Sequence, residues 1–130
     1  MPMILIEVAN KYTKEQEIAI IKAAHSALLE TFKVTLEAIN TRLLVHEPYR
    51  FSVPAHCNPD CYVLISIDCF IGRSLATKRH LYQVIVENLN VLGIPKDHIK
   101  IVLRESAAEN WGILGGFAGC DVDVGYKVEV

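Results

Sequence analysis

The chain has 130 residues, of which 52% are hydrophobic and 22% charged, and its formal net charge is −2 at pH 7. This length suits one domain with a buried core, and the near-neutral charge balance gives no electrostatic reason to expect nucleic acid or an anionic membrane as a partner. No apolar run reaches the about 18 residues that a membrane span needs, and the N-terminus lacks the features of a signal peptide, so a cytoplasmic location is expected.

The first predicted element is a buried strand over residues 3–8, and Pro2 directly precedes it. Proline has no backbone N–H and is tolerated at the first residue of a strand, so Pro2 can be a simple strand entry. It can also have a chemical role, because removal of Met1 would leave Pro2 as a free secondary amine. The sequence around the first strand leaves both interpretations open.

A helix and a second strand are expected to complete the first half of the chain. Thr13 and Gln16 have the spacing of a capping box, which marks the start of a helix. Apolar residues at four-residue spacing then predict a helix that packs on a sheet: Ile20, Ala24 and Leu28. Residues 39–45 alternate apolar and polar side chains, as a strand does.

The second half repeats this order when the chain is aligned with itself at a shift of about 60 residues. Residues 62–67 are an apolar run rich in β-branched side chains, and Ser74 with Thr77 forms a weaker helix-start signal. A second apolar stripe follows and stops at Gly93, before a strand over residues 99–103. The stripe consists of Leu81, Ile85 and Leu89.

These elements predict an α+β fold of two β-α-β repeats in one domain. The repeats span about residues 2–47 and 61–106, with a linker at 48–60 and a tail at 107–130. Each crossover makes its two strands parallel, so the repeats together give a four-stranded sheet with both helices on one face. The other face is left apolar and uncovered, and we expect another subunit to cover it. Alternating apolar residues at 122–130 could add a short strand to a neighbouring subunit.

The cysteines do not favour a metal site or a disulfide. Cys57 and Cys61 have a spacing that zinc sites use, but no second Cys/His pair of suitable spacing follows them. In a cytosolic chain, these two and the remaining cysteines (Cys69 and Cys120) are expected to stay reduced. His25 lies within the first helical stripe and is interpreted as a packed helix residue rather than a catalyst.

Three features together resemble the tautomerase superfamily. They are the Met-Pro start with the tandem repeat, residues 70–78 (FIGRSLATK) and residues 109–116 (ENWGILGG). The resemblance covers nearly the whole chain and is nearest to the malonate semialdehyde decarboxylase branch and its tautomerase-like relatives. It implies a homotrimer of such fused chains, a small carboxylate substrate, and no metal or other cofactor.

The resemblance also implies a role for individual residues. Pro2 matches the catalytic amino-terminal proline, which would act as a base because an apolar pocket and a nearby cation both disfavour its protonated form. Arg73 matches the arginine that binds the substrate carboxylate, helped by N–H groups of the following helix, and Trp111 matches an aromatic residue that lines the pocket. Lys100 falls where one-repeat members place a second arginine, and Arg42 is a further cation on the corresponding strand of the first repeat.

Departures from the family pattern decide between the activities that the resemblance implies. Ala38 stands where the decarboxylase and hydratase members have an acidic residue, and Ile71 replaces a second substrate arginine. We therefore expect keto–enol tautomerisation of a small 2-oxo acid, with decarboxylase, dehalogenase or hydratase activity as the alternative. If Met1 is retained, Pro2 is an amide without basicity, and a non-catalytic trimeric binding protein is the remaining alternative.

Overall fold

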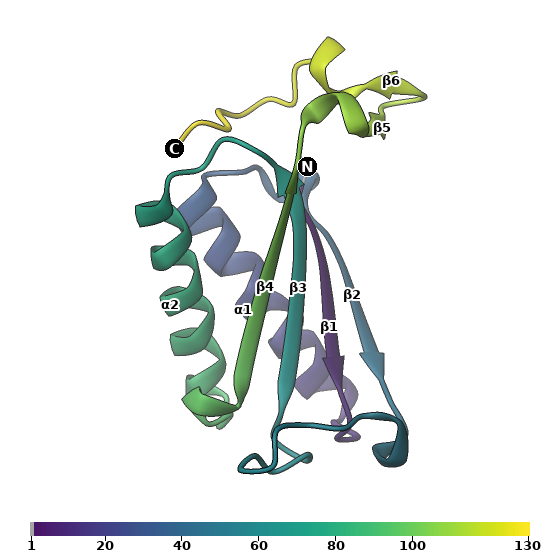
Figure 1. The fold of residues 1–130 in the computed structure, drawn as a ribbon, viewed down its shortest axis with the longest axis vertical. Helices are drawn as coiled ribbons and strands as arrows, with labels where there is room; N and C mark the ends of the chain where they lie inside the picture. The colour runs from purple at the N-terminus through teal and green to yellow at the C-terminus, as the bar shows by residue number, and fades with distance from the viewer. Residues whose placement is uncertain (1) are drawn as a thin grey trace.

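The computed structural model describes residues 2–130, with both helices on one side of a four-stranded sheet (Figure 1). Met1, whose retention or removal matters for Pro2, lies outside the described residues. No helix in residues 2–130 has the length and apolar character needed to span a membrane. The main elements are β1 (Met3–Val8), α1 (Lys14–Phe32), β2 (Asn40–Val45), β3 (Val63–Phe70), α2 (Leu75–Val91) and β4 (Ile99–Ser106).

The sheet has the strand order β2-β1-β3-β4. β1 is parallel to β2 and β3 is parallel to β4, whereas the two central strands β1 and β3 are antiparallel. The two β-α-β units therefore meet along β1 and β3 in opposite directions. This confirms the predicted tandem repeat and its α+β class, and it places the start of β1 at the same end of the sheet as the end of β3.

Both helices begin at the predicted caps. Thr13 Oγ1 accepts a hydrogen bond from the Gln16 N–H at 3.2 Å, and Gln16 Oε1 accepts one from the Thr13 N–H at 2.8 Å, which completes a capping box. Ser74 Oγ accepts from the Thr77 N–H at 3.2 Å. After the helices the backbone adopts positive φ, at Lys33 (φ 56) and at Gly93 (φ 94), so the two repeats end their helices alike.

The core lies between the sheet and the two helices. Alternate residues of the central strands point toward the helices and are fully buried, and each such side chain contributes about 1.5–3 kcal/mol of hydrophobic stabilisation. The helices bury the predicted stripes against them. These core residues are Ile4, Ile6, Val8, Val63, Ile65, Ile67, Ile20, Ala24, Leu28, Leu81, Ile85 and Leu89.

The other face of the sheet carries no helix and leaves apolar side chains exposed. Leu44 on β2 and Val102 on β4 are 48% and 40% exposed. β3 and β4 stay paired as far as Phe70 and Ser106, beyond the predicted strand ends. Two charged side chains on this face form a pair, in which Arg104 Nε donates to Asp68 Oδ1 at 3.0 Å. The helix-free face is thus a mixture of apolar residues and charges.

Within one chain the tail makes no strand over residues 122–130, and the pairing of this segment with a neighbouring subunit stays a prediction. The tail contains a short hairpin of β5 (Gly112–Ile113) and β6 (Phe117–Ala118), after which residues 122–130 form no regular element. This last segment instead lies back on the start of α2, where Val130 O accepts hydrogen bonds from Thr77 Oγ1 at 2.8 Å and from the Ser74 N–H at 3.3 Å. The alternating pattern at 122–130 therefore reflects packing on the chain's own helix rather than strand pairing within the chain.

His25 joins α1 to β2, since its Nε2 lies 2.6 Å from Thr41 Oγ1. Desolvation lowers the pKa of His25, so the folded state keeps this ring neutral at a pH where the unfolded chain, with an ordinary histidine pKa of about 6.5, takes up a proton. The free energy of unfolding is expected to fall as the pH drops from 7 to 5. His25→Gln should flatten this dependence in urea titrations, whereas the same change at the exposed His80 should leave it as in the wild type.

Candidate functional site

A cavity of about 310 Å³ lies at the N-terminal end of β1. Pro2 is buried at its edge, and the Pro2 carbonyl accepts a hydrogen bond from the Asn40 N–H at 3.2 Å, which ties Pro2 to the start of β2. Trp111 lies on the same cavity, which brings together two of the predicted site residues. The lining consists of Pro2, Met3, Glu37, Ala38, Ile39, Asn40, Trp111, Gly112 and Ile113.

Trp111 is fixed by two contacts to the ends of β3 and β4 and by one to Gly119, which follows β6. Its indole Nε1 donates to Ser106 Oγ at 2.8 Å, and its ring meets the ring of Phe70 edge-on at a centroid distance of 5.2 Å. Its carbonyl accepts from the Gly119 N–H at 2.8 Å. The side chain is therefore held as a wall of the Pro2 cavity rather than free in solvent.

Gly119 permits this arrangement, because a Cβ there would lie 2.6 Å from the carbonyl oxygen of Ala108. Gly119→Ala is expected to displace the hairpin and shift the fluorescence of Trp111, the only tryptophan in the chain, to longer wavelength. Gly112→Ala is the matched control, since a Cβ at that position would meet nothing within 4 Å. Equal emission spectra for the two variants would contradict the proposed constraint.

Arg73 lies at the same end of the sheet, in the connection from β3 to α2 (Figure 1), and its side chain is almost fully buried at 5% exposure. Its Nη1 donates to the Phe70 carbonyl at 3.1 Å, and its guanidinium carbon lies 4.4 Å from the centroid of the Phe32 ring. Nε and Nη2 have no hydrogen-bond partner within residues 2–130. A buried guanidinium with two free donors is costly unless an anion reaches it.

The structure does not bring Arg73 and the helix N–H groups to the cavity in the way that the sequence suggested. Arg73 does not line the Pro2 cavity, although it bonds to Phe70, whose ring contacts Trp111. The Ser74 N–H already donates to Val130 O and the Thr77 N–H to Ser74 Oγ. These two N–H groups of α2 are therefore engaged within the chain.

Neither Arg42 nor Lys100 lines the Pro2 cavity within one chain. Both are exposed on the helix-free face, Arg42 beside Leu5 and Lys100 beside Leu64. Lys100 lies near the end of β1 opposite to Pro2, on a different cavity of about 490 Å³ that includes Cys57, Tyr62 and Tyr82. A single chain therefore does not assemble these cations with Pro2.

Glu37 is a cavity residue that the sequence analysis missed. It lies on the short 3-10 helix Leu36–Ala38 and lines the Pro2 cavity beside Ala38, the position that was expected to lack an acid. Because Glu37 is next to Ala38 in the sequence, it could have been proposed as the acidic residue of the site. Ile71, by contrast, is 60% exposed and outside this lining.

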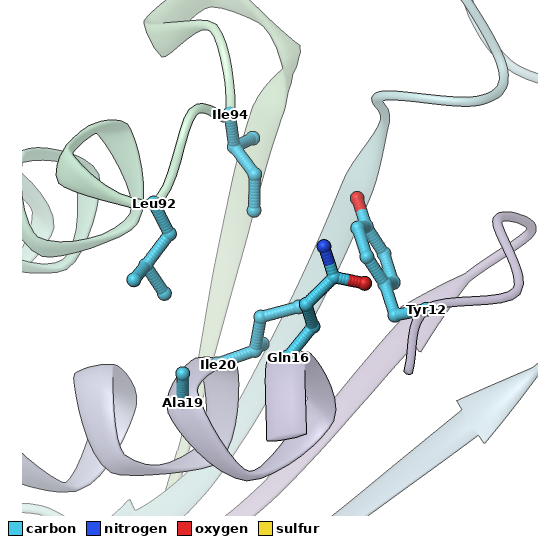
Figure 2. A pocket seen from close by; sticks show the side chains of 6 residues that line it. All are labelled: Tyr12, Gln16, Ala19, Ile20, Leu92 and Ile94. Atoms are coloured by element: carbon cyan, nitrogen blue, oxygen red, sulfur yellow. The ribbon is translucent and has the colours of Figure 1, made fainter. Parts of the chain in front are cut away.

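The position in the first repeat that corresponds to Arg73 is Tyr12, which lines a cavity without charged residues that is smaller than the Pro2 cavity. Tyr12 precedes the cap Thr13 as Arg73 precedes Ser74, and Figure 2 shows its ring at a cavity of about 80 Å³ between the start of α1 and the residues after α2. Burial raises the pKa of Tyr12, so its phenol stays neutral. None of the six lining residues is charged: Tyr12, Gln16, Ala19, Ile20, Leu92 and Ile94.

The cysteine loop is organised by His98. His98 Nδ1 lies 2.8 Å from Asp97 Oδ1, and its Nε2 accepts the Asn58 N–H at 2.9 Å, which fixes the turn that carries Cys57 and Cys61. Both thiols are free. Within residues 2–130, no three His, Cys, Asp or Glu side chains are grouped so that they could hold a metal ion.

Comparisons with known proteins agree with this fold. The chain is 26% identical to a malonate semialdehyde decarboxylase crystallised with 3-bromopropiolate, with a TM-score of 0.80 over 89% of this chain and 92% of that one. A second malonate semialdehyde decarboxylase structure is 20% identical, with a TM-score of 0.82 over 93% and 99% of the two chains. A fused 4-OT wild-type symmetric trimer is 18% identical, with a TM-score of 0.81 over 91% and 96%.

The family comparison extends over more than half of the chain. A search of curated proteins found no match to this chain. The model of a family described as "Tautomerase enzyme" matches residues 38–114, from the 3-10 helix at the Pro2 cavity through Arg73 to the loop that carries Trp111. On this match, and with the tandem β-α-β fold, the chain belongs to the tautomerase family.

Proposed function

We propose that the protein is a cofactor-independent keto–enol tautomerase of a small 2-oxo acid, with Pro2 as the general base once Met1 has been removed. The observation that carries the proposal is the cavity shared by Pro2 and Trp111, at the end of the sheet where Arg73 is buried without an acidic partner. A proton shuttle needs a base, a group that holds the substrate carboxylate and a site with little water, and we assign these roles to Pro2, Arg73 and Trp111.

The chemistry would proceed in two proton transfers. The neutral Pro2 amine removes a proton from the carbon beside the 2-oxo group, or from the enol oxygen in the reverse direction, and returns it to the other atom. Arg73 binds the carboxylate and stabilises the negative charge that develops on the enolate oxygen. Trp111 keeps water from the cavity, so the charge interactions are stronger than in bulk solvent.

We also propose that the active form is a homotrimer. The helix-free face of the sheet exposes Leu44 and Val102, and the fused 4-OT proteins with the same fold form trimers. Arg42 and Lys100 lie on this face. In a trimer, such cations from one subunit can reach a substrate in another, which is the role we propose for them.

Decarboxylation or hydration is a second candidate because Glu37 lines the Pro2 cavity. A carboxylate at that place can position a water molecule for addition to a small unsaturated or aldehyde acid. The identity of 26% to a malonate semialdehyde decarboxylase also supports this candidate. It ranks second because Ala38 and Ile71 replace the polar residues that the family pattern has at those positions.

The test is a substrate screen on protein whose intact mass shows the loss of Met1. Phenylpyruvate enol and 2-hydroxymuconate should turn over, whereas malonate semialdehyde and chloroacrylates should react slowly. The same protein with Met1 retained is the control, and it should be inactive because Pro2 is then an amide. Faster turnover of malonate semialdehyde would favour the second candidate, and no turnover of any acid would favour a non-catalytic binding protein.

A further inference from the structure

The buried polar atoms without a partner converge on one place in the structure. Within residues 2–130 they number three, namely Arg73 Nε, Arg73 Nη2 and the Tyr126 hydroxyl. The two side chains are neighbours: burial raises the Tyr126 pKa, while the positive charge of Arg73 and the approach of its N–H groups to the phenol oxygen lower it in part. The approach does not reach the geometry of a hydrogen bond, so the three atoms stay without a partner. Buried polar groups without a hydrogen-bond partner are rare in folded proteins. Two neighbouring side chains that both lack partners therefore indicate a missing ligand.

The last segment of the chain holds Tyr126 against this place. Val130 O is bonded to Thr77 Oγ1 and the Ser74 N–H on one side of Tyr126. Val128 packs on Gly72, where a Cβ would lie 2.8 Å from Val128 Cγ1 and where φ is +151°, so this close approach needs glycine. The phenol is therefore positioned by contacts to the residues on either side of Arg73 in the sequence.

The free atoms have the chemistry of a carboxylate site. Nε and Nη2 form one edge of the guanidinium, and their parallel N–H groups match the two oxygens of a carboxylate. No acidic side chain within residues 2–130 forms an ion pair with Arg73, and Glu105 on the adjoining β4 is paired with Lys78 Nζ at 2.5 Å. Burial keeps the Tyr126 phenol protonated, so it can donate a further hydrogen bond to the same anion.

We propose that Tyr126 is a substrate-binding residue that completes, with Arg73, a carboxylate site beneath residues 122–130. The identity of the carboxylate as that of a 2-oxo acid rests on the proposed function, whereas the site itself rests on the three unpartnered atoms. A planar carboxylate would accept from the Arg73 edge and from the phenol. The guanidinium edge presents two coplanar N–H donors, and the carboxylate supplies the two acceptors.

Tyr126→Phe tests the site, since it removes the hydroxyl and keeps the ring that packs on the core. Isothermal titration with pyruvate should show a dissociation constant about tenfold higher or more, as expected for loss of a hydrogen bond to a charged group. The KM for phenylpyruvate enol should rise similarly with kcat little changed. Tyr12→Phe is the matched control at the other end of the molecule, and it should bind pyruvate as the wild type does.

The outcomes separate this proposal from the proposed function. Weakened pyruvate binding in Tyr126→Phe, in a protein that turns over no enol acid, would support the carboxylate site and count against the tautomerase. Unchanged pyruvate binding in Tyr126→Phe would overturn the site even if the enzyme is active. Absence of pyruvate binding by the wild type at millimolar concentration would overturn it as well.

Discussion

Arg73→Met is expected to abolish most of the activity while making the unliganded protein more stable. Loss of the guanidinium removes the carboxylate contact and a donor to the enolate, so kcat/KM should fall by about 100-fold or more, in line with the loss of one oxyanion-hole donor. The same guanidinium is 5% exposed and has two unpartnered nitrogens. Its replacement by an apolar side chain of similar length should raise the free energy of unfolding by about 1 kcal/mol or more.

The gain in stability is smaller than the full cost of burying a charge, because the native site offsets part of that cost. Nη1 bonds to the Phe70 carbonyl, and the Phe32 ring lies beneath the guanidinium. Arg79→Met, at an exposed position on α2, makes the same change a short distance along the chain and should change neither the activity nor the free energy of unfolding by much. A destabilised but fully active Arg73→Met protein would show that Arg73 is a structural residue and not a carboxylate ligand.

The parts of the fold that the sequence predicted are those with local causes. Thr13 and Ser74 act as caps because their oxygens bond to N–H groups three residues away, and that spacing is visible in the chain. The short apolar run at residues 3–8, rich in β-branched side chains, marks the central strand in the same way. The parallel pairing within each repeat followed from its crossover, whereas the order β2-β1-β3-β4 and the antiparallel contact of β1 with β3 come from the structure.

The parts that sequence reasoning missed depend on segments that are distant along the chain. Tyr126 meets Arg73 only because the tail returns to the start of α2, and the alternating pattern of the tail was interpreted as a strand. Glu37 faces the Pro2 cavity because the Trp111 loop closes that cavity from the far end of the chain. Neither contact can be predicted from the secondary-structure propensity of nearby residues. The resemblance to a family singled out Pro2 and Arg73, but it did not indicate how far Arg73 would be buried.

Val102→Asp should dissociate the proposed trimer and, with it, most of the activity. Val102 lies on the helix-free face, 40% exposed, in register with Ser66 of β3. If three subunits bury this face, the change places three carboxylates in an apolar contact, and each one loses its hydration without gaining a partner. Sedimentation at micromolar concentration should show a monomer, and kcat/KM should fall because Arg42 and Lys100 of a neighbouring subunit no longer reach the site.

Val91→Asp is the matched control, because Val91 is 84% exposed on α2, whose buried stripe faces the sheet through other residues. It makes the same chemical change on the helix side of the molecule and should leave the protein trimeric and active. Circular dichroism should show a folded Val102→Asp chain, since the core lies between the sheet and the helices and not on the substituted face. A trimeric, active Val102→Asp protein would mean that this face is not the interface. A folded, fully active monomer would mean that one chain holds the complete site, and that Arg42 and Lys100 have no part in it.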